Sequence, residues 1–132
     1  MDPAFGGLKV GDELEPLRLT ISAAANERYW RAAGLDDPLL EAGAIYPLIA
    51  ANLIVLALTR HYPDAMIQTA QQLQCHRIAV APSELVTCAR VNKRYEKRGL
   101  QYIVIAATVT VDGEQLWDAS AHFTPAAAVN TR

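Results

Sequence analysis

Hydrophobic residues are most continuous in the segment Ala44–Leu58, which carries no charge and has Asn52 as its only clearly polar residue. A surface helix shows one apolar stripe, whereas a helix that is apolar all round is enclosed by the rest of its fold. The run is shorter than the roughly 20 residues that cross a bilayer. The pattern therefore predicts a buried central helix, and Asn52 must find hydrogen-bond partners, in a strand or across a dimer interface in preference to a ligand.

The flanking segments predict a short helix and several strands. Ser22 is a suitable N-cap for a helix over Ala23–Ala33, with Tyr29 or Trp30 facing inward and Gly34 ending it. Asp112-Gly113 is a strong hairpin turn. Period-two or β-branched patterns predict strands over Leu14–Ile21, Met66–Val80, Leu85–Tyr95, Leu100–Val111 and Gln115–Thr124.

These elements together predict an α+β fold in which one curved antiparallel sheet wraps around the central helix, which is the hotdog architecture. We expect residues 1–132 to form a single domain, with residues 1–7 and 126–132 as frayed tails. A single sheet of this kind leaves an edge strand open, so we also expect the chain to form a dimer.

The composition narrows the function. The 132 residues carry a net charge of −2, which argues against a nucleic-acid binder. Two cysteines without close spacing exclude a disulfide scaffold and a four-cysteine zinc site. The chain starts with Met1-Asp2-Pro3 and lacks the basic, apolar pattern of a secretory signal. We therefore expect a cytoplasmic protein that binds no membrane.

Several short motifs, taken in their order and spacing, resemble the MaoC-like dehydratase branch of the hotdog proteins over almost the whole chain. The motifs are Gly11-Asp12, Tyr29-Trp30 before Gly34, Asp37-Pro38-Leu39, Ala44-Ile45-Tyr46-Pro47, His76-Arg77 before Pro82, Lys97-Arg98-Gly99 and Asp112-Gly113-Glu114. The resemblance implies an acyl-thioester ligand, carried on coenzyme A or on acyl carrier protein.

In that family an aspartate and a histidine on a signature loop activate a water, and a glycine amide at the start of the central helix polarises the thioester carbonyl. With the signature anchored on Pro38, the aspartate falls on Leu35 and the histidine on Leu40. The family's His-Gly pair falls on Tyr46-Pro47, and proline has no backbone N–H. The resemblance thus implies the fold without the usual catalytic groups.

Four residues are candidates for replacing those groups. Asp36 and Asp37 lie on the signature loop and offer a displaced carboxylate, or they simply form the turn before Pro38. Tyr46 offers a hydroxyl donor at the start of the helix, or packs at a dimer seam. His76 has a side chain suited to proton transfer, or is structural.

Other polar residues have weaker assignments. Glu41 is a further loop acid. The basic stretch Lys93–Arg98 could bind the phosphates of coenzyme A or an acidic carrier protein. The alternative is that it is only a solvated strand end. Cys75 and Cys88 could face each other on neighbouring strands. No metal-ligand spacing and no glycine-rich phosphate loop is present, so we expect neither a metal nor a cofactor.

The sequence therefore supports three hypotheses. The first is an enzyme acting on an acyl thioester, a divergent hydratase or dehydratase with relocated catalytic groups Tyr46, Asp36 or Asp37, and His76. The second is a non-catalytic acyl-binding subunit that pairs with an active hotdog chain. The third is a thioesterase, for which Glu41 or Asp37 supplies the carboxylate.

Overall fold

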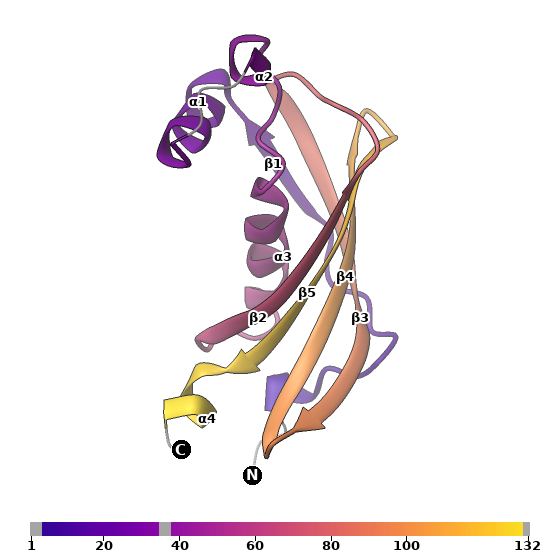
Figure 1. Ribbon diagram of the computed structural model, residues 1–132. Coiled ribbons are helices and arrows are strands. Elements are labelled where there is room, and N and C mark those ends of the chain that lie inside the picture. The colour runs from indigo at the N-terminus through magenta and orange to yellow at the C-terminus, as the bar shows by residue number, and fades with distance from the viewer. Residues whose placement is uncertain (1–3, 35–37, 131–132) are drawn as a thin grey trace.

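The computed structural model describes residues 4–34 and 38–130, which form one five-stranded antiparallel sheet and several helices. Along the sheet the strands follow the order β1-β3-β4-β5-β2. The helix α3 lies along one face of the sheet, and the helices α1 and α2 lie near the end where α3 begins (Figure 1). The elements are η1 (Ala4–Gly7), β1 (Leu17–Ile21), α1 (Ala23–Ala32), α2 (Pro38–Glu41), α3 (Ile49–Thr59), β2 (Met66–Cys75), β3 (Ser83–Lys97), β4 (Leu100–Val111), β5 (Glu114–Pro125) and α4 (Ala126–Asn130).

The core lies between α3 and the sheet. Side chains along a strand point alternately to its two faces, so β4 turns Ile103, Ile105 and Val109 toward α3, and each is fully buried. The helix contributes Ile49, Ala50, Leu53, Ile54, Ala57 and Leu58, all 1% exposed or less. Burial of one large aliphatic side chain stabilises a fold by about 1.5–3 kcal/mol. The predicted sheet around a central helix is confirmed.

One side of α3 is open, which the sequence did not predict. Leu48 and Leu56 are 53% and 46% exposed, and Asn52 between them is exposed as well. The expectation of a helix enclosed on all sides is wrong for the single chain because the sheet covers α3 from one side only (Figure 1). Asn52 thus has no need of a partner within its own chain.

The helix is also shorter than predicted. It begins at Ile49 instead of Ala44, because the preceding residues pair as extended chain. Ala44 forms an isolated bridge with Val80, and the N–H of Ile45 donates to the carbonyl of Ala79 at 2.9 Å. These bonds fix the segment through which the chain enters α3.

The short helix α1 follows its local sequence signals. The Ser22 hydroxyl accepts a hydrogen bond from the Ala25 N–H at 3.1 Å, and Gly34 adopts the left-handed conformation (φ +72°). Of the two aromatic residues expected to face inward, Trp30 is the buried one, at 3% exposed.

The chain ends carry more structure than the expected frayed tails. Phe5 in η1 is fully buried in the core and lies 5.2 Å from the Tyr62 ring, centroid to centroid. Residues 126–130 form α4. Cys75 and Cys88 are not neighbours as suggested, because β4 and β5 separate their strands. Among the described residues, no helix is long and apolar enough to span a bilayer.

Candidate functional site

The residues at the start of α3 are held by Asn26, a polar side chain of α1 that is only 2% exposed. Its Nδ2 donates to the carbonyl of Ala44 at 2.8 Å and, at 3.4 Å, to that of Gly43. Its Oδ1 accepts from the Tyr46 N–H at 2.9 Å. Because both ends of the amide are satisfied, burial of Asn26 fixes the path of residues 43–46.

Trp30, one turn further along α1, completes this attachment. Its Nε1 donates to the same Ala44 carbonyl at 2.8 Å. Its ring meets the Tyr46 ring edge to face, with centroids 5.0 Å apart. Tyr46 therefore lies at the N-terminal end of α3 as predicted, with its backbone and ring both held by α1. No hydrogen bond to its hydroxyl is found within the described part of the chain.

The first free backbone donor of α3 is at Leu48. Pro47 has no N–H, and the Tyr46 N–H is occupied by Asn26. The N–H groups of Ile49 and Ala50 turn back to the carbonyls of Tyr46 and Pro47. Within the described residues the Leu48 N–H has no acceptor, and it lies where the helix dipole favours negative charge.

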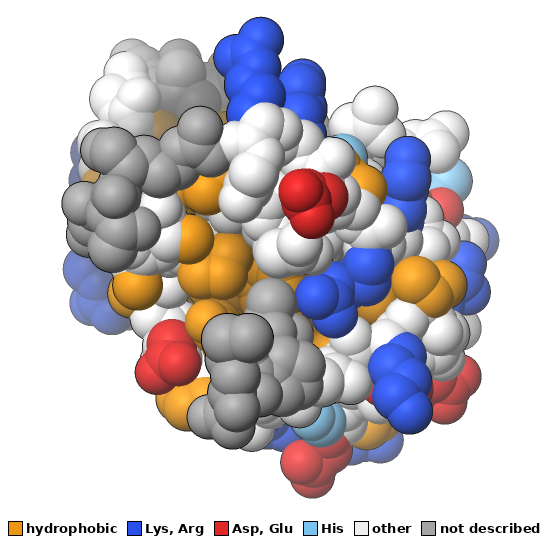
Figure 2. Space-filling model, turned by 90° about the horizontal axis from the view of Figure 1, so that it is seen from below, with side chains coloured by type: hydrophobic (Ala, Val, Ile, Leu, Met, Phe, Trp, Pro, Cys, Tyr) orange, Lys and Arg blue, Asp and Glu red, His pale blue; other side chains and the backbone are white. Residues whose placement is uncertain are grey.

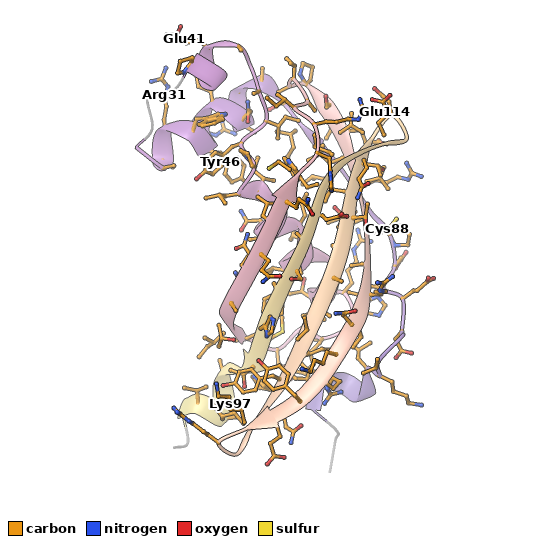
Figure 3. All side chains as sticks on the ribbon, turned by 45° about the vertical axis from the view of Figure 1, so that its right-hand side comes forward. Arg31, Glu41, Tyr46, Cys88, Lys97 and Glu114 are labelled. Carbon is orange, nitrogen blue, oxygen red and sulfur yellow. The ribbon has the colours of Figure 1, made fainter. Side chains whose placement is uncertain are left out.

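A cavity of about 330 Å³ opens beside Asn26, between α1 and the segment after α2. Its walls include the ion pair Glu27–Arg31 (2.8 Å) and the carboxylate of Glu41. Figure 3 shows Arg31, Glu41 and Tyr46 at the same end of the molecule. Glu41 therefore lies on the wall of this cavity, at the same end of the molecule as the start of α3.

The two signature-loop acids, Asp36 and Asp37, lie outside the described residues, as does Leu35, and the side chain of Leu40 is likewise not described. The structure therefore gives the position of Tyr46 at the start of α3 but not the positions of the two carboxylates proposed to act with it.

His76 lies away from Tyr46, on the other face of the sheet. Its Nε2 is 2.9 Å from Oδ2 of Asp118, whose strand neighbours Trp117 and Ala119 point into the core. Asp118 therefore points to the outer face, opposite α3. The structure does not bring His76 together with Tyr46.

Asp118 is the centre of a small polar cluster on that outer face. Its other oxygen, Oδ1, accepts from Thr108 Oγ1 at 3.2 Å and from Gln115 Nε2 at 2.6 Å. The hydrogen bond from His76 is the main cause that lowers the pKa of Asp118, against a smaller opposing effect of burial. The cluster borders shallow hollows of about 530 and 520 Å³ on the outer face.

The basic stretch at the end of β3 lies far from the start of α3. Lys97 is at the opposite end of the molecule from Tyr46 (Figure 3). Arg94 donates to the Leu8 carbonyl and covers the Phe5 ring, so it anchors the N-terminal segment. Figure 2 views this end and shows Lys and Arg side chains around an apolar centre. In the part of the chain that the structure describes, no group of three His, Cys, Asp or Glu side chains is placed to hold a metal.

Solved structures of hydratases and dehydratases share this fold. The R-hydratase PhaJ1 of Pseudomonas aeruginosa superposes with a TM-score of 0.75 at 18% identity, covering 92% of this chain and 84% of that one. The HadBC (3R-hydroxyacyl-ACP dehydratase) complex of Mycobacterium tuberculosis gives 0.73 at 19% identity, covering 87% and 96%. A MaoC-like dehydratase of Rhodospirillum rubrum gives 0.72 at 18% identity, covering 93% and 96%.

No protein-family model matches the chain, and no curated protein matches it. The structural matches confirm the resemblance noted from the sequence at the level of the fold: this chain is an α+β hotdog protein with the architecture of the MaoC-like dehydratases and R-hydratases.

Two residues that organise these clusters were missed by the sequence analysis. Asn26 is one of four polar residues in the ten-residue helix α1, and only its position one turn before the buried Trp30 hints at a role. Asp118 is identified through its pairing with Gln74 of β2 across the sheet, which no local pattern reveals.

Proposed function

We propose that this chain binds an acyl thioester, carried on coenzyme A or on acyl carrier protein, at the N-terminal end of α3. The acyl chain lies along the open face of the helix, beside Leu48 and Leu56. The proposal is supported by the hotdog fold, because hydratases and dehydratases share it.

The observation that carries the proposal is the exposed apolar surface next to a free donor. Leu48 is 53% exposed and supplies both an apolar side chain and an N–H without an acceptor among the described residues. A thioester needs an apolar path for its chain and a donor for its carbonyl oxygen. The Leu48 N–H would donate to the thioester carbonyl, which Pro47 cannot do because it has no N–H.

The positions of the groups that could transfer a proton favour binding of the thioester over its turnover. The one His–Asp pair of the described residues, His76–Asp118, lies on the outer face of the sheet. Of the described candidates, Tyr46 lies at the start of α3, and Glu41 lies at the same end of the molecule. A water that adds to a double bond needs a base within hydrogen-bond reach, and in this chain Glu41, Asp36 or Asp37 would have to supply it.

A divergent hydratase therefore remains the second candidate, with Tyr46 as donor and Asp36 or Asp37 as base. The position of Tyr46 favours it. A partner chain could also supply the base, because the HadBC dehydratase is solved as a complex. The cytoplasmic location expected from the sequence stays a prediction.

Calorimetric titration with acyl-CoAs of increasing chain length tests the proposal. We expect saturable binding that strengthens with chain length and weakens at least tenfold for Leu56→Asn. Val10→Asn is the matched control, because Val10 is 60% exposed and lies in the N-terminal segment, away from α3. Equal losses in both variants, or no binding by the unmodified chain, would refute the proposal.

Turnover is measured in the same samples. Hydration of an enoyl-CoA that falls in Tyr46→Phe while binding persists would establish the hydratase. Release of free coenzyme A that depends on Glu41 would establish a thioesterase. Binding without either reaction is the result that we expect.

A further inference from the structure

We propose that the outer face of the sheet, opposite α3, holds a second binding site and that this site takes a neutral oligosaccharide. Two hollows of about 530 and 520 Å³ lie on this face, and Asp118 lines both of them. Each has a volume within the range of small-ligand sites, about 300–1,000 Å³. We call the two hollows together the outer trough. Because α3 packs against the other face of the sheet (Figure 1), a ligand in the outer trough does not compete with a thioester beside α3.

The outer trough exists because the two central strands present short side chains to the outside. Ala106 and Thr108 of β4 and Ser120 of β5 point away from the core, since their neighbours along each strand are buried in it. Longer side chains flank this floor in register: Arg90 of β3 lies opposite Ala106, and Gln72 of β2 lies opposite Ser120. The surface is therefore a trough with a floor of small residues and polar rims.

A fixed carboxylate and a free carboxamide lie side by side in the outer trough. Asp118 of β5 pairs in register with Gln74 of β2, so both side chains are on the outer face. The three hydrogen bonds to Asp118 hold its carboxylate in place. A carboxylate has about four acceptor positions, so one remains for a ligand. The exposed Gln74 amide both donates and accepts. Neighbouring hydroxyl groups of a sugar suit this pair, because a hydroxyl also donates and accepts.

Aromatic side chains close the end of the outer trough toward the β3–β4 turn. Tyr95 and Tyr102 are cross-strand neighbours whose rings stack with centroids 4.8 Å apart and planes 4° apart. The Tyr95 hydroxyl lies 2.9 Å from Nδ1 of His122, which fixes the ring. Both tyrosines stay partly exposed and offer an apolar wall for the C–H face of a sugar ring. From Tyr102 to Thr108 the outer face runs six residues along β4, roughly 20 Å. That length suits an oligosaccharide better than a single sugar.

The charges around the outer trough favour a neutral ligand. Arg90 and Lys93 flank it as cations on β3, and Glu13 and Asp118 are acids on its walls. The two signs therefore balance. A nucleic acid or a sulfated sugar needs an excess of Lys and Arg to neutralise its anionic groups. Hydroxyl, carboxamide and aromatic groups make up the rest of the surface, and these are the groups that bind uncharged polyols.

NMR titration of the ¹⁵N-labelled full chain with neutral tetrasaccharides of glucose, mannose, galactose and N-acetylglucosamine tests the proposal. We expect at least one of them to bind saturably and to shift the amide resonances of residues 102–108 and 118–122 more than those of α3. Ala106→Leu should raise the Kd at least tenfold, because leucine fills the floor of the trough. Thr20→Leu is the matched control, since Thr20 is exposed on β1 and lines neither hollow.

A second variant keeps the test independent of how well Ala106→Leu folds. Gln74→Ala removes one hydrogen-bonding side chain from an exposed position and should raise the Kd about threefold. Circular dichroism melting compares the stability of each variant with that of the original. The proposal is overturned if no neutral tetrasaccharide binds, or if both variants bind like the original. It is also overturned if a sulfated tetrasaccharide or a single-stranded oligonucleotide binds these residues more tightly than every neutral sugar.

Discussion

Removal of the Asn26 side chain should destabilise the protein more than its place on a short surface helix suggests. The variant Asn26→Ala deletes the acceptor of the Tyr46 N–H and one of the two donors to the Ala44 carbonyl. Trp30 continues to donate to Ala44 at 2.8 Å, so that carbonyl keeps a partner. The Tyr46 N–H does not.

The magnitude follows from these contacts. A buried donor left without a partner costs about 1–3 kcal/mol. Loss of one of two donors to the Ala44 carbonyl adds about 0.5–1.5 kcal/mol. We expect Asn26→Ala to lower the free energy of unfolding by about 2–4 kcal/mol, which exceeds the roughly 1 kcal/mol average for point variants.

Urea denaturation at one fixed protein concentration measures the effect, since self-association would make the measured stability depend on concentration. Asn92→Ala, at an exposed position, is the control and should change stability by less than about 0.5 kcal/mol. Trp30→Phe completes a double-mutant cycle, in which the shared Ala44 carbonyl should produce a coupling energy of about 0.5–3 kcal/mol. A loss for Asn26→Ala as small as that of the control would refute the reasoning.

Three further variants test single features. Asp118→Asn should lower the free energy of unfolding by less than about 1 kcal/mol at neutral pH, since the pair with His76 is partly exposed. Because the pKa of Asp118 is lowered in the folded state, the carboxylate stabilises the fold above about pH 4, and this stabilisation is lost as the pH falls through the folded-state pKa. Chemical denaturation should therefore show the stabilities of the original protein and the variant converging in acid. Gly43→Ala should cost about 1–2 kcal/mol, because φ is +78° and the added Cβ would lie 3.1 Å from Val80 Cγ1; an unchanged melting temperature would contradict this. Phe5→Ala should lower the free energy of unfolding in urea by about 3–5 kcal/mol, because Phe5 is fully buried in the core. A loss close to zero would instead indicate a frayed N-terminal end.

Local sequence signals predicted the elements whose limits are set by local chemistry. The strand β4 has the predicted limits Leu100–Val111, because it is rich in β-branched residues (103–105 and 108–111) and ends at the hairpin turn. Asp112 and Gly113 both adopt positive φ, as such a turn requires. The cap at Ser22 was found in the same way.

Long-range pairing explains what the sequence did not predict. Strand order places β2 beside β5, so Cys75 lies opposite Trp117 instead of Cys88. The same pairing brings His76 to Asp118, 42 residues away in the chain. Asn26 reaches Tyr46 across 20 residues. Hydrophobic periodicity predicts which face of a strand is buried, but it does not predict which strand lies beside it. These contacts depend on the order of the strands in the sheet.

The sheet separates two kinds of chemistry in this molecule. Its outer face carries the titratable pair His76–Asp118, whereas the face toward α3 carries apolar side chains and, at the helix start, Tyr46. Proton transfer requires direct contact or a bridging water, so a group on the outer face cannot serve a thioester beside α3. A hydratase built on this chain would therefore have to draw its base from the signature loop, from Glu41 or from a partner chain. If none of them supplies one, the same surface binds the thioester and leaves it intact.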